Sequence, residues 1–313
     1  MLNVNSLKCL KLKHSYITYD TLGGFPMDQF QFGEMQLTWL KGGITALDGG
    51  AMFGVVPKAL WSKKYPVNDQ NQIELVCEAI LIQYRGKNYL IDAGVGSGKL
   101  TEKQLRNYGV FEQSTIETSL TSLGLAATDI DVVLMTHMHF DHASGLTKWD
   151  GNRLVPTFPN AMIYVTEIEW EEMKNPNIRS ANTYWKENWE PIEHLVQTFT
   201  FDIEIVEGII MEHTGGHSDG HAIIRLMQNG QTMLHMGDIM PTHAHVNPLW
   251  VLAYDDYPMT SIFAKQRLQK LAFEKGYSFF FYHDAYVRIA KWDETGKQME
   301  TILSRSEQAN IQF

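Results

Sequence analysis

Four side chains that can bind a metal ion lie within six residues of one another near the middle of the chain. The segment Thr136–Gly145 contains His137, His139, Asp141 and His142. Imidazole nitrogens and carboxylate oxygens are ligands that zinc and similar divalent ions take at short range. One ion seldom needs four ligands from a single loop. The spacing therefore indicates two ions, about 3.5–4 Å apart as in other two-metal hydrolytic sites.

The residues around this cluster indicate where it lies in a fold. The apolar run Val132–Met135 directly precedes it and is typical of a buried strand. Open α/β sheets place their sites just beyond the carboxyl ends of strands. The alternative, a polar surface loop, fits a buried strand end poorly. After the cluster, small and apolar residues from Ala143 to Trp149 predict a short helix.

Three other apolar stretches end in a side chain that could complete a two-metal site. A glycine turn carries His217, the run Thr232–Met236 leads to Asp238, and the run Phe279–Tyr282 precedes His283. With the first four, these side chains make seven ligands. That number suits two ions that share one bridging carboxylate.

The order and spacing of these motifs resemble the metallo-β-lactamase superfamily. Within it, the chain looks most like the N-acyl homoserine lactone lactonases, closest to the YtnP-like quorum-quenching enzymes. Two further stretches, 48–58 and 241–245, support that resemblance. It implies an α/β fold, the αββα sandwich of two mixed β-sheets flanked by helices. The ligand sets it implies are His137, His139 and His217 for one metal, Asp141, His142 and His283 for the other, and Asp238 as the bridge.

The resemblance also implies a chemistry. Zinc is the expected metal, with iron, manganese or cobalt as alternatives. Two such ions bring the pKa of a shared water toward neutrality, so that a hydroxide held between them attacks the lactone carbonyl. Asp141 is expected to be both a ligand and the catalytic proton shuttle. The ring ester opens to a hydroxy acid without a covalent intermediate.

Other residues are expected to support the metals or to contact the substrate. Asp92, at a strand end, and His221, at the start of a strand, are expected to hold the metal ligands in place. Many homoserine lactonases have a tyrosine three residues after the bridging aspartate, where this chain has Pro241. Tyr254, Tyr282, His243 and His245 are the candidates to replace it. The predicted substrate-pocket residues are Met52, Phe53, His243, His245 and Tyr282.

Two segments are candidate walls of a substrate pocket. Residues 49–66 form a predicted loop rich in apolar side chains, which either pack under a sheet, line the pocket or reach a partner subunit. Residues 167–197 are rich in Trp and Glu and predict two helices joined around Asn175–Asn177. This insert either caps the site with its tryptophans turned inward or packs as a plain helix pair on the sheet.

The remaining pattern predicts strands at 7–22, 34–48 and 75–84, and helices at 258–275 and 296–310. The glycine-rich turn at 92–99 resembles a nucleotide loop, but Leu100 stands where the phosphate loop needs Ser or Thr.

Composition bounds the class of protein. The 313 residues are 44% hydrophobic and 20% charged, as in ordinary globular proteins, and we expect a single hydrolase domain over 1–313. A net charge of −10 without a basic cluster argues against nucleic-acid binding. No apolar run reaches 18 residues, and lysines interrupt the first 16, so we expect a cytoplasmic protein with no membrane span. The expected partner is a small ester or lactone, and residues 49–66 make a homodimer plausible.

Other functions remain open at this point. An organophosphate triesterase of the methyl parathion hydrolase type shares nearly all the ligand motifs. A thioester hydrolase is a more distant alternative, and a non-catalytic metal-binding protein another. β-Lactamases with a cysteine ligand are excluded, because no cysteine follows Cys77.

Overall fold

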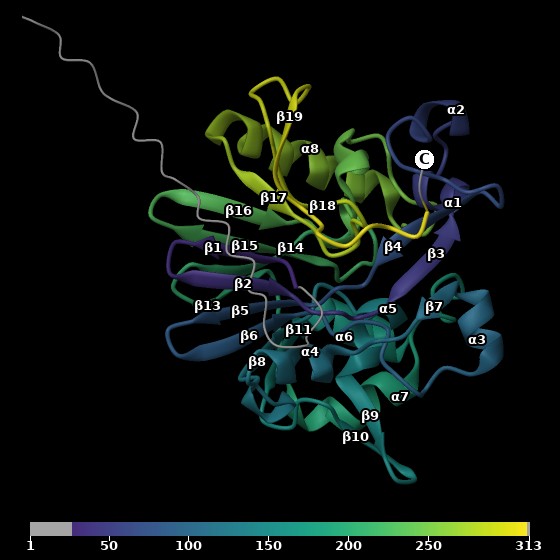
Figure 1. The fold of residues 1–313 in the computed structure, drawn as a ribbon, viewed down its shortest axis with the longest axis vertical. Helices are drawn as coiled ribbons and strands as arrows, with labels where there is room; N and C mark the ends of the chain where they lie inside the picture. The colour runs from purple at the N-terminus through teal and green to yellow at the C-terminus, as the bar shows by residue number, and fades with distance from the viewer. Residues whose placement is uncertain (1–26, 312–313) are drawn as a thin grey trace, which may run out of the picture.

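Two seven-stranded mixed β-sheets lie face to face through the middle of the molecule (Figure 1). The computed structural model describes residues 27–311, so the strand predicted at 7–22 lies outside the described residues. In spatial order, the first sheet contains β1 (Gln29–Phe32), β2 (Met35–Trp39), β5 (Ile80–Tyr84), β6 (Lys87–Ile91), β8 (Val132–Leu134), β11 (Met162–Thr166) and β12 (Val196–Phe199). From β6 to β12 the neighbours are parallel, and the rest are antiparallel.

The second sheet follows the chain order. It contains β13 (Asp202–Val206), β14 (Ile209–His213), β15 (Ala222–Gln228), β16 (Gln231–His235), β17 (Ser278–Phe280), β18 (Val287–Trp292) and β19 (Met299–Ser304). Only β16 and β17 pair in parallel in this sheet. The predicted metal ligands follow β8 of the first sheet and β14, β16 and β17 of the second, so both sheets contribute to one site.

The main core fills the space between the sheets. Side chains such as Leu37 and Ile82 from the first sheet pack with Met211, Ile224 and Ile289 from the second, and all five are inaccessible to solvent. Each such burial contributes roughly 1.5–3 kcal/mol relative to exposure. Successive side chains in a strand point to opposite faces of the sheet. The side chains that do not face the space between the sheets therefore point outward, where helices cover them.

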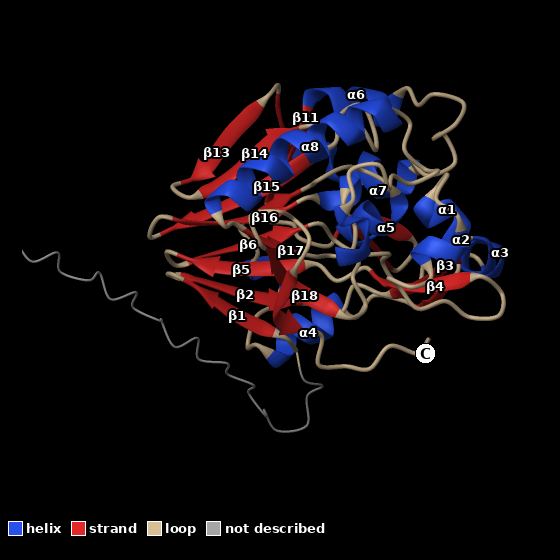
Figure 2. Cartoon of the chain, turned by 90° about the horizontal axis from the view of Figure 1, so that it is seen from above, coloured by secondary structure: helices blue, strands red, loops and turns tan. Residues whose placement is uncertain are grey.

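Helices cover the outer face of each sheet (Figures 1 and 2). α4 (Ile116–Ser122) and α6 (Glu167–Lys174) pack on the first sheet, and α8 (Pro258–Lys275) packs on the second. Proline at its start and Gly276, with φ +68°, at its end fix the limits of α8. The structure thus confirms the predicted αββα sandwich and the predicted helix at 258–275.

Smaller elements complete the chain. A three-stranded sheet joins the two main sheets at one end, and a hairpin projects beside the first. These elements are β3 (Ile44–Asp48), β4 (Gln72–Val76), β7 (Val110–Glu112), β9 (Thr147–Asp150), β10 (Arg153–Pro156), α1 (Gly49–Phe53), α2 (Lys58–Trp61), α3 (Glu102–Asn107), α5 (Phe140–Ala143) and α7 (Lys186–Trp189).

The apolar segment 49–66 was predicted to be a loop. It contains two short helices instead, α1 and α2. Asp48 caps α1 by accepting a hydrogen bond from the Ala51 amide. Phe53 at its end stacks on Trp61 of α2, with ring centroids 4.9 Å apart. Gly49 and Gly50 disfavour a helix in sequence-based prediction, so α1 was not predicted. The contact between Phe53 and Trp61 stabilises both short helices.

Three other predictions of secondary structure were wrong. The run 75–84 is interrupted at 77–79, so β4 and β5 lie in different sheets. Instead of the helix predicted at 143–149, α5 ends at Ala143, and a 3₁₀ turn at Ser144–Leu146 leads into β9. Within the tail predicted as a helix at 296–310, residues Met299–Ser304 form the edge strand β19, because pairing with β18 satisfies their backbone.

The Trp-rich insert matches its prediction in part. Its first helix is α6, but the second consists of the four-residue α7 followed by a 3₁₀ turn at Glu190–Leu195. Trp170 and Trp189 pack into the core beneath the first sheet rather than turning toward a cleft. For Trp170 and Trp189, the insert therefore follows the alternative of a helical segment packed on the sheet, whereas Trp185 packs on Phe140 and Tyr108.

Candidate metal centre and substrate pocket

The seven ligand candidates converge at one edge of the two sheets. The loop after β8 and the first turn of α5 carry His137, His139, Asp141 and His142. The loop after β14 carries His217, and the ends of β16 and β17 are followed by Asp238 and His283. All five histidines are buried, His137 and His142 completely. Residues far apart in the sequence thus form one cluster inside the protein.

The two oxygens of Asp238 divide the cluster into two groups. Its Oδ2 lies 3.3 Å from His217 Nε2 and 3.9 Å from His137 Nε2. Its Oδ1 lies 3.4 Å from His142 Nε2 and 3.2 Å from His283 Nε2. One carboxylate therefore faces both predicted ligand sets, one oxygen toward each.

The other members complete each group. His139 Nδ1 lies 2.9 Å from His217 Nε2, and the ligand atoms of His137, His139 and His217 all lie within 4.8 Å of one another. In the second group, Asp141 Oδ2 lies 3.6 Å from His283 Nε2. The structure thus brings together all seven predicted residues around Asp238.

A hydrogen bond to the outer ring nitrogen orients four of the histidines. His217 Nδ1 lies 2.8 Å from Asp255 Oδ1, and His142 Nδ1 lies 2.8 Å from Asp92 Oδ2. His283 Nδ1 lies 2.8 Å from the Val76 carbonyl oxygen, and His137 Nδ1 lies 3.0 Å from Thr136 Oγ1. When the outer nitrogen carries the proton, the inner one presents a lone pair to the cluster. Proteins hold metal-binding histidines in this way.

These residues fit a pair of divalent cations. His142 Nε2 and His283 Nε2 lie only 3.0 Å apart, close for two lone pairs unless they share a cation. Among the described residues, His137 Nε2 and Asp238 Oδ1 are buried without a hydrogen-bond partner, which is costly. Burial lowers the pKa of His137 and His139 well below the ordinary 6.5, which keeps both imidazoles neutral and able to bind a metal.

Asp92 and His221 both lie behind the cluster, as expected. Asp92 accepts hydrogen bonds from the backbone and the hydroxyl of Thr136, as well as facing His142. His221 Nε2 accepts from the Asp238 amide at 3.1 Å. A Cβ on Gly237, whose φ is +50°, would lie 2.4 Å from that same nitrogen. Glycine therefore precedes Asp238 because the turn needs a positive φ and His221 approaches closely.

The sequence analysis missed two carboxylates that support the cluster. Asp255 orients His217, as described above. Glu169, at the start of α6, accepts from the Met138 amide at 2.7 Å and from Ser218 Oγ at 2.5 Å, so it ties together two ligand loops. Burial raises the pKa of Glu169 to about 7. Nothing in the pattern distinguishes these acids from the exposed acids beside them.

A cavity of about 450 Å³ opens onto the cluster. Ligand residues form its floor, and its walls differ in polarity. The apolar lining residues are Leu47, Met52, Leu75, Phe140, Leu252 and Ala253, and the polar ones are Asn107, Tyr108, Arg179, Ser180, Asn182, Thr183, Tyr254 and Asp256. The insert 167–197 contributes its residues 179–183, not its tryptophans, to the polar wall.

Of the five predicted pocket residues, only Met52 lines this cavity. Phe53 is sealed between Trp61 and His245, and His245 is held by the Met52 carbonyl oxygen, 2.8 Å from its Nε2. His243 is paired with Asp284, 2.6 Å from its Nδ1. These three side chains fix the wall from behind and do not touch the cavity, which corrects the prediction.

Tyr282 also lies behind the pocket. Its hydroxyl donates to the Asp141 carbonyl oxygen at 2.7 Å and accepts from the Gly94 amide at 3.0 Å. Its ring stacks on His142, with centroids 4.6 Å apart. Both sides of the hydroxyl are used, so Tyr282 positions the ligand loop and is not the substrate contact predicted for it.

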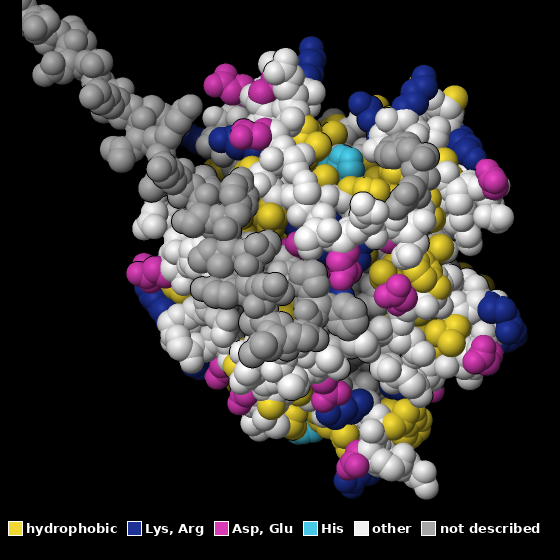
Figure 3. Space-filling model, viewed as in Figure 1, with side chains coloured by type: hydrophobic (Ala, Val, Ile, Leu, Met, Phe, Trp, Pro, Cys, Tyr) yellow, Lys and Arg dark blue, Asp and Glu magenta, His cyan; other side chains and the backbone are white. Residues whose placement is uncertain are grey.

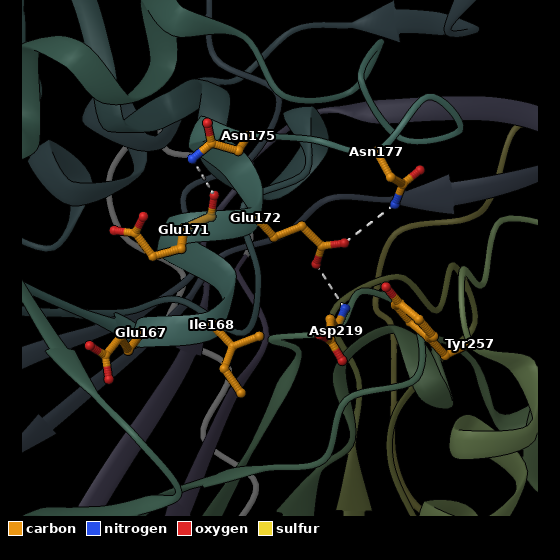
Figure 4. Close-up of a pocket in the computed structure, with 8 residues that line it drawn as sticks. All are labelled: Glu167, Ile168, Glu171, Glu172, Asn175, Asn177, Asp219 and Tyr257. Atoms are coloured by element: carbon orange, nitrogen blue, oxygen red, sulfur yellow. Dashed lines mark hydrogen bonds between the residues drawn. The ribbon is translucent and has the colours of Figure 1, made fainter.

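A second hollow, of about 580 Å³, lies on the outer side of α6 (Figure 4). Its lining includes Glu167, Glu171, Glu172 and Asp219, and Glu172 accepts from the Asp219 amide at 2.8 Å. It contains no histidine and no cluster of converging ligand atoms. Although larger, it offers none of the chemistry of the first cavity.

Comparison with known proteins agrees with this geometry. The chain belongs to the metallo-beta-lactamase superfamily, which it matches over residues 73–276. Within this class of metal-dependent hydrolases, a probable metal-dependent hydrolase from Staphylococcus aureus has a similar crystal structure. The two chains are 48% identical with a TM-score of 0.86, over 90% of this chain and 100% of that one.

Two named relatives are more distant. A probable metallo-hydrolase of Mycobacterium tuberculosis is 23% identical over 218 residues, which are 60% of this chain and 66% of that protein. An N-acyl homoserine lactonase of a Bacillus species is 26% identical over 214 residues, which are 62% of this chain and 76% of that protein. The chain thus spans slightly less than two thirds of the mycobacterial relative.

Two surface observations bear on the predicted partners. No helix in residues 27–311 has the length and apolar character needed to cross a membrane. On the face shown in Figure 3, acidic and basic side chains are interspersed. The predictions of a small-molecule partner and of a homodimer stay predictions.

Proposed function

We propose that this chain is a two-metal hydrolase that opens the lactone ring of N-acyl homoserine lactones. The observation that carries the proposal is Asp238, whose two oxygens face two complete ligand groups at the floor of an accessible cavity. The lactonase relative and the two-sided pocket favour this substrate among esters. Zinc is the metal we expect, since histidine nitrogens and carboxylate oxygens form the whole ligand set.

The bound metals would supply Lewis acidity for the ester carbonyl and a water molecule of lowered pKa. The chain supplies the rest. His137, His139 and His217 would hold one ion, while Asp141, His142 and His283 would hold the other. Four of the five histidines have an anchored outer nitrogen, so they need little rearrangement during turnover, which is how preorganised sites reduce a barrier.

Asp141 is the ligand best placed to move a proton. Its side chain is the most exposed of the cluster's carboxylates, at 14%, and it lines the cavity. The bond from Tyr282 to its carbonyl oxygen holds its backbone in place. Its carboxylate can take a proton from the attacking water and return it to the leaving alkoxide, the general acid–base role proposed for it.

The two walls suit an acylated lactone. A fatty acyl chain can lie along Leu47, Met52 and Leu252, while the amide of the substrate faces the polar side chains at 179–183. Cavities with an apolar lining and a few polar groups orient ligands in this manner.

A hydrolysis panel with zinc-loaded protein tests the proposal. It compares N-acyl homoserine lactones of several chain lengths with a paraoxon-type phosphotriester and a thioester. A preference for lactones by orders of magnitude is the expected result. Equal or faster turnover of the phosphotriester or the thioester would contradict it and favour the alternative branch. Bound metal without hydrolysis of any ester would favour a non-catalytic metal-binding protein.

A further inference from the structure

The guanidinium group of Arg179 is held in place at the polar wall of the cavity. Its Nε donates to Asp256 Oδ1 at 2.9 Å, and its Nη2 donates to the backbone carbonyl oxygens of Ala253 and Asp255. Asn177 supports this arrangement from behind. Its Oδ1 accepts from the Arg179 amide at 2.8 Å, and its Nδ2 donates to Asp256 Oδ2 at 2.7 Å. The side of the guanidinium that carries Nε and Nη2 is therefore fixed.

The remaining nitrogen, Nη1, makes no hydrogen bond to any residue in 27–311. The Arg179 side chain is 55% exposed, and it lines the same cavity as the ligand candidates Asp141, Asp238 and His283. A guanidinium is planar and always protonated, so the two N–H groups of Nη1 point in directions that the other nitrogens set. Arg179 thus has two oriented donors left for a ligand in the cavity.

The hydroxyl groups of the same wall segment behave differently. Ser180 and Thr183 also line the cavity and can donate a hydrogen bond. A hydroxyl hydrogen can turn to another acceptor when a ligand offers none. Nη1 of Arg179 cannot turn without breaking the hydrogen bonds of Nε and Nη2. Its donors therefore need an acceptor on the ligand once the water around them is displaced, because a desolvated donor without a partner is costly.

The charges around Arg179 indicate which acceptor suits it. The carboxylate of Asp256, whose side chain is 4% exposed, already pairs with the guanidinium. A neutral carbonyl oxygen therefore suits Nη1 better than a second anion, which Asp256 would repel. An unsubstituted acyl chain would cover Nη1 with methylene groups and leave its donors unpaired, whereas a carbonyl group on the chain would accept from it.

We propose that Arg179 determines the acyl specificity of this pocket: its Nη1 donates a hydrogen bond to a ketone oxygen on the acyl chain, so that the pocket prefers N-(3-oxoacyl) homoserine lactones to unsubstituted ones. The amide of the substrate faces residues 179–183 in the proposed function. A ketone at carbon 3 is close to that amide and can reach the same wall. The inference rests on the proposed function, because it concerns the acyl chain of the same substrate.

The test compares N-(3-oxohexanoyl) with N-hexanoyl homoserine lactone, which have chains of equal length. The ketone lies outside the ring, so it alters the intrinsic reactivity of the lactone little. In the full-length, zinc-loaded wild type we expect kcat/KM to be roughly 5- to 20-fold higher for the 3-oxo substrate. This is the low end of what an unpaired desolvated donor costs, because the side chain is only half covered.

Arg179→Met should lower this ratio to about 1, since it removes the donor. Loosening of the 253–255 backbone would slow both substrates alike, so the ratio isolates the contact with the acyl chain. Arg153→Met is the matched control, because Arg153 is exposed on β10 and lies outside the lining of the cavity. It should keep the wild-type ratio. Metal content and thermal midpoint are measured for each protein.

A binding measurement gives a readout that needs no turnover. The probes are the two lactam analogues, hexanoyl and 3-oxohexanoyl, in which NH replaces the ring oxygen. Calorimetry should show that the wild type and Arg153→Met bind the 3-oxo lactam roughly 5- to 20-fold more tightly, and that Arg179→Met binds the two equally.

The outcomes separate this inference from the proposed function. If the wild type opens both lactones with equal kcat/KM, or if Arg179→Met keeps the wild-type preference, the inference fails and the proposed function stands. If the wild type opens no lactone, the proposed function fails and the lactams decide the inference. Equal affinities for the two lactams, or no binding of either, would overturn it, whereas a 3-oxo preference that Arg179→Met abolishes would support it.

Discussion

The floor and the walls of the cavity are built differently. Each ligand candidate on the floor follows a strand or opens a short helix, and buried partners such as Asp92 and Asp255 fix its orientation. Most of the wall comes from three separate segments, near residues 47–52, 179–183 and 252–256, and the first and third, as well as the second and third, are joined by hydrogen bonds to backbone groups. Rigid elements are suited to holding reacting groups, whereas loops are suited to setting the choice of substrate.

The strongest test of this contrast removes the bridge on the floor. We expect Asp238→Asn to lose at least one metal per chain and to lower hydrolysis on the order of 1,000-fold, since a bound metal contributes several kcal/mol of transition-state stabilisation. Elemental analysis and initial rates measure both effects. Asp150→Asn, an exposed carboxylate of β9, is the matched control. Full activity and full metal content in Asp238→Asn would refute the two-metal site.

Removing an anchor behind the floor should have a smaller effect. Asp255→Ala deletes the partner of His217 Nδ1, and loss of such a partner typically weakens metal binding 10- to 100-fold. Competition with a chelator measures the affinity. Asp256→Ala provides the control, since the Asp256 side chain pairs with Arg179 and only its backbone amide, which the substitution keeps, contacts His217. Equal affinities in the two variants would show that the anchor does not matter.

The same contrast explains what the sequence could and could not predict. His137 to His142 crowd one strand end, so residue type and spacing alone indicate a metal site. Asp238 and His283 follow apolar runs, which made them candidates too. Glu169 and Asp255 are as essential to the geometry, yet each lies among other acids, and only the folded chain shows which carboxylate is buried.

The walls were predicted less well, also for physical reasons. Phe53 lies in α1 and His245 in a 3₁₀ turn at His243–Val246, and these short helical turns point both side chains away from the cavity, whereas Met52 of α1 lines it. The tail at 296–310 has apolar residues at helical spacing, yet pairing with β18 decides its form. Side-chain direction in short helices and edge strands depends on tertiary contacts that no local pattern records.

A change in the wall should alter selectivity and leave the floor intact. Met52→Ala enlarges the cavity beside the apolar wall, which should favour a longer acyl chain. The ratio of kcat/KM for decanoyl over hexanoyl homoserine lactone should therefore rise about 3- to 10-fold, the discrimination that one or two methylene groups provide. Metal content should not change. Met162→Ala, at an exposed site on β11, is the control. An unchanged ratio would mean that the acyl chain lies elsewhere.

The last expected effect is on stability and not on hydrolysis, and it concerns Lys265, which supports the wall from α8. Its side chain is fully buried, and Nζ donates to the carbonyl oxygens of Asn247 and Trp250 at 3.1 and 2.8 Å. Burial lowers the pKa of Lys265 from 10.5 to about 7. Between these two values the unfolded chain binds a proton that the native protein does not bind. The stability of the wild type should therefore rise as pH increases from about 7 toward 10.5.

Lys265→Met lacks this titration, so its stability relative to the wild type should fall by about 1–2 kcal/mol between pH 7 and pH 9, against an upper limit of about 1.4 kcal/mol per pH unit. Urea unfolding at the two pH values measures the difference, independently of the hydrogen bonds that the substitution also removes. Lys270→Met, on the exposed face of the same helix, should change the free energy of unfolding only slightly, and by the same amount at pH 7 and pH 9. If the two variants share one pH dependence, Lys265 stays protonated in the folded protein, and the wall above it is supported by a buried charge.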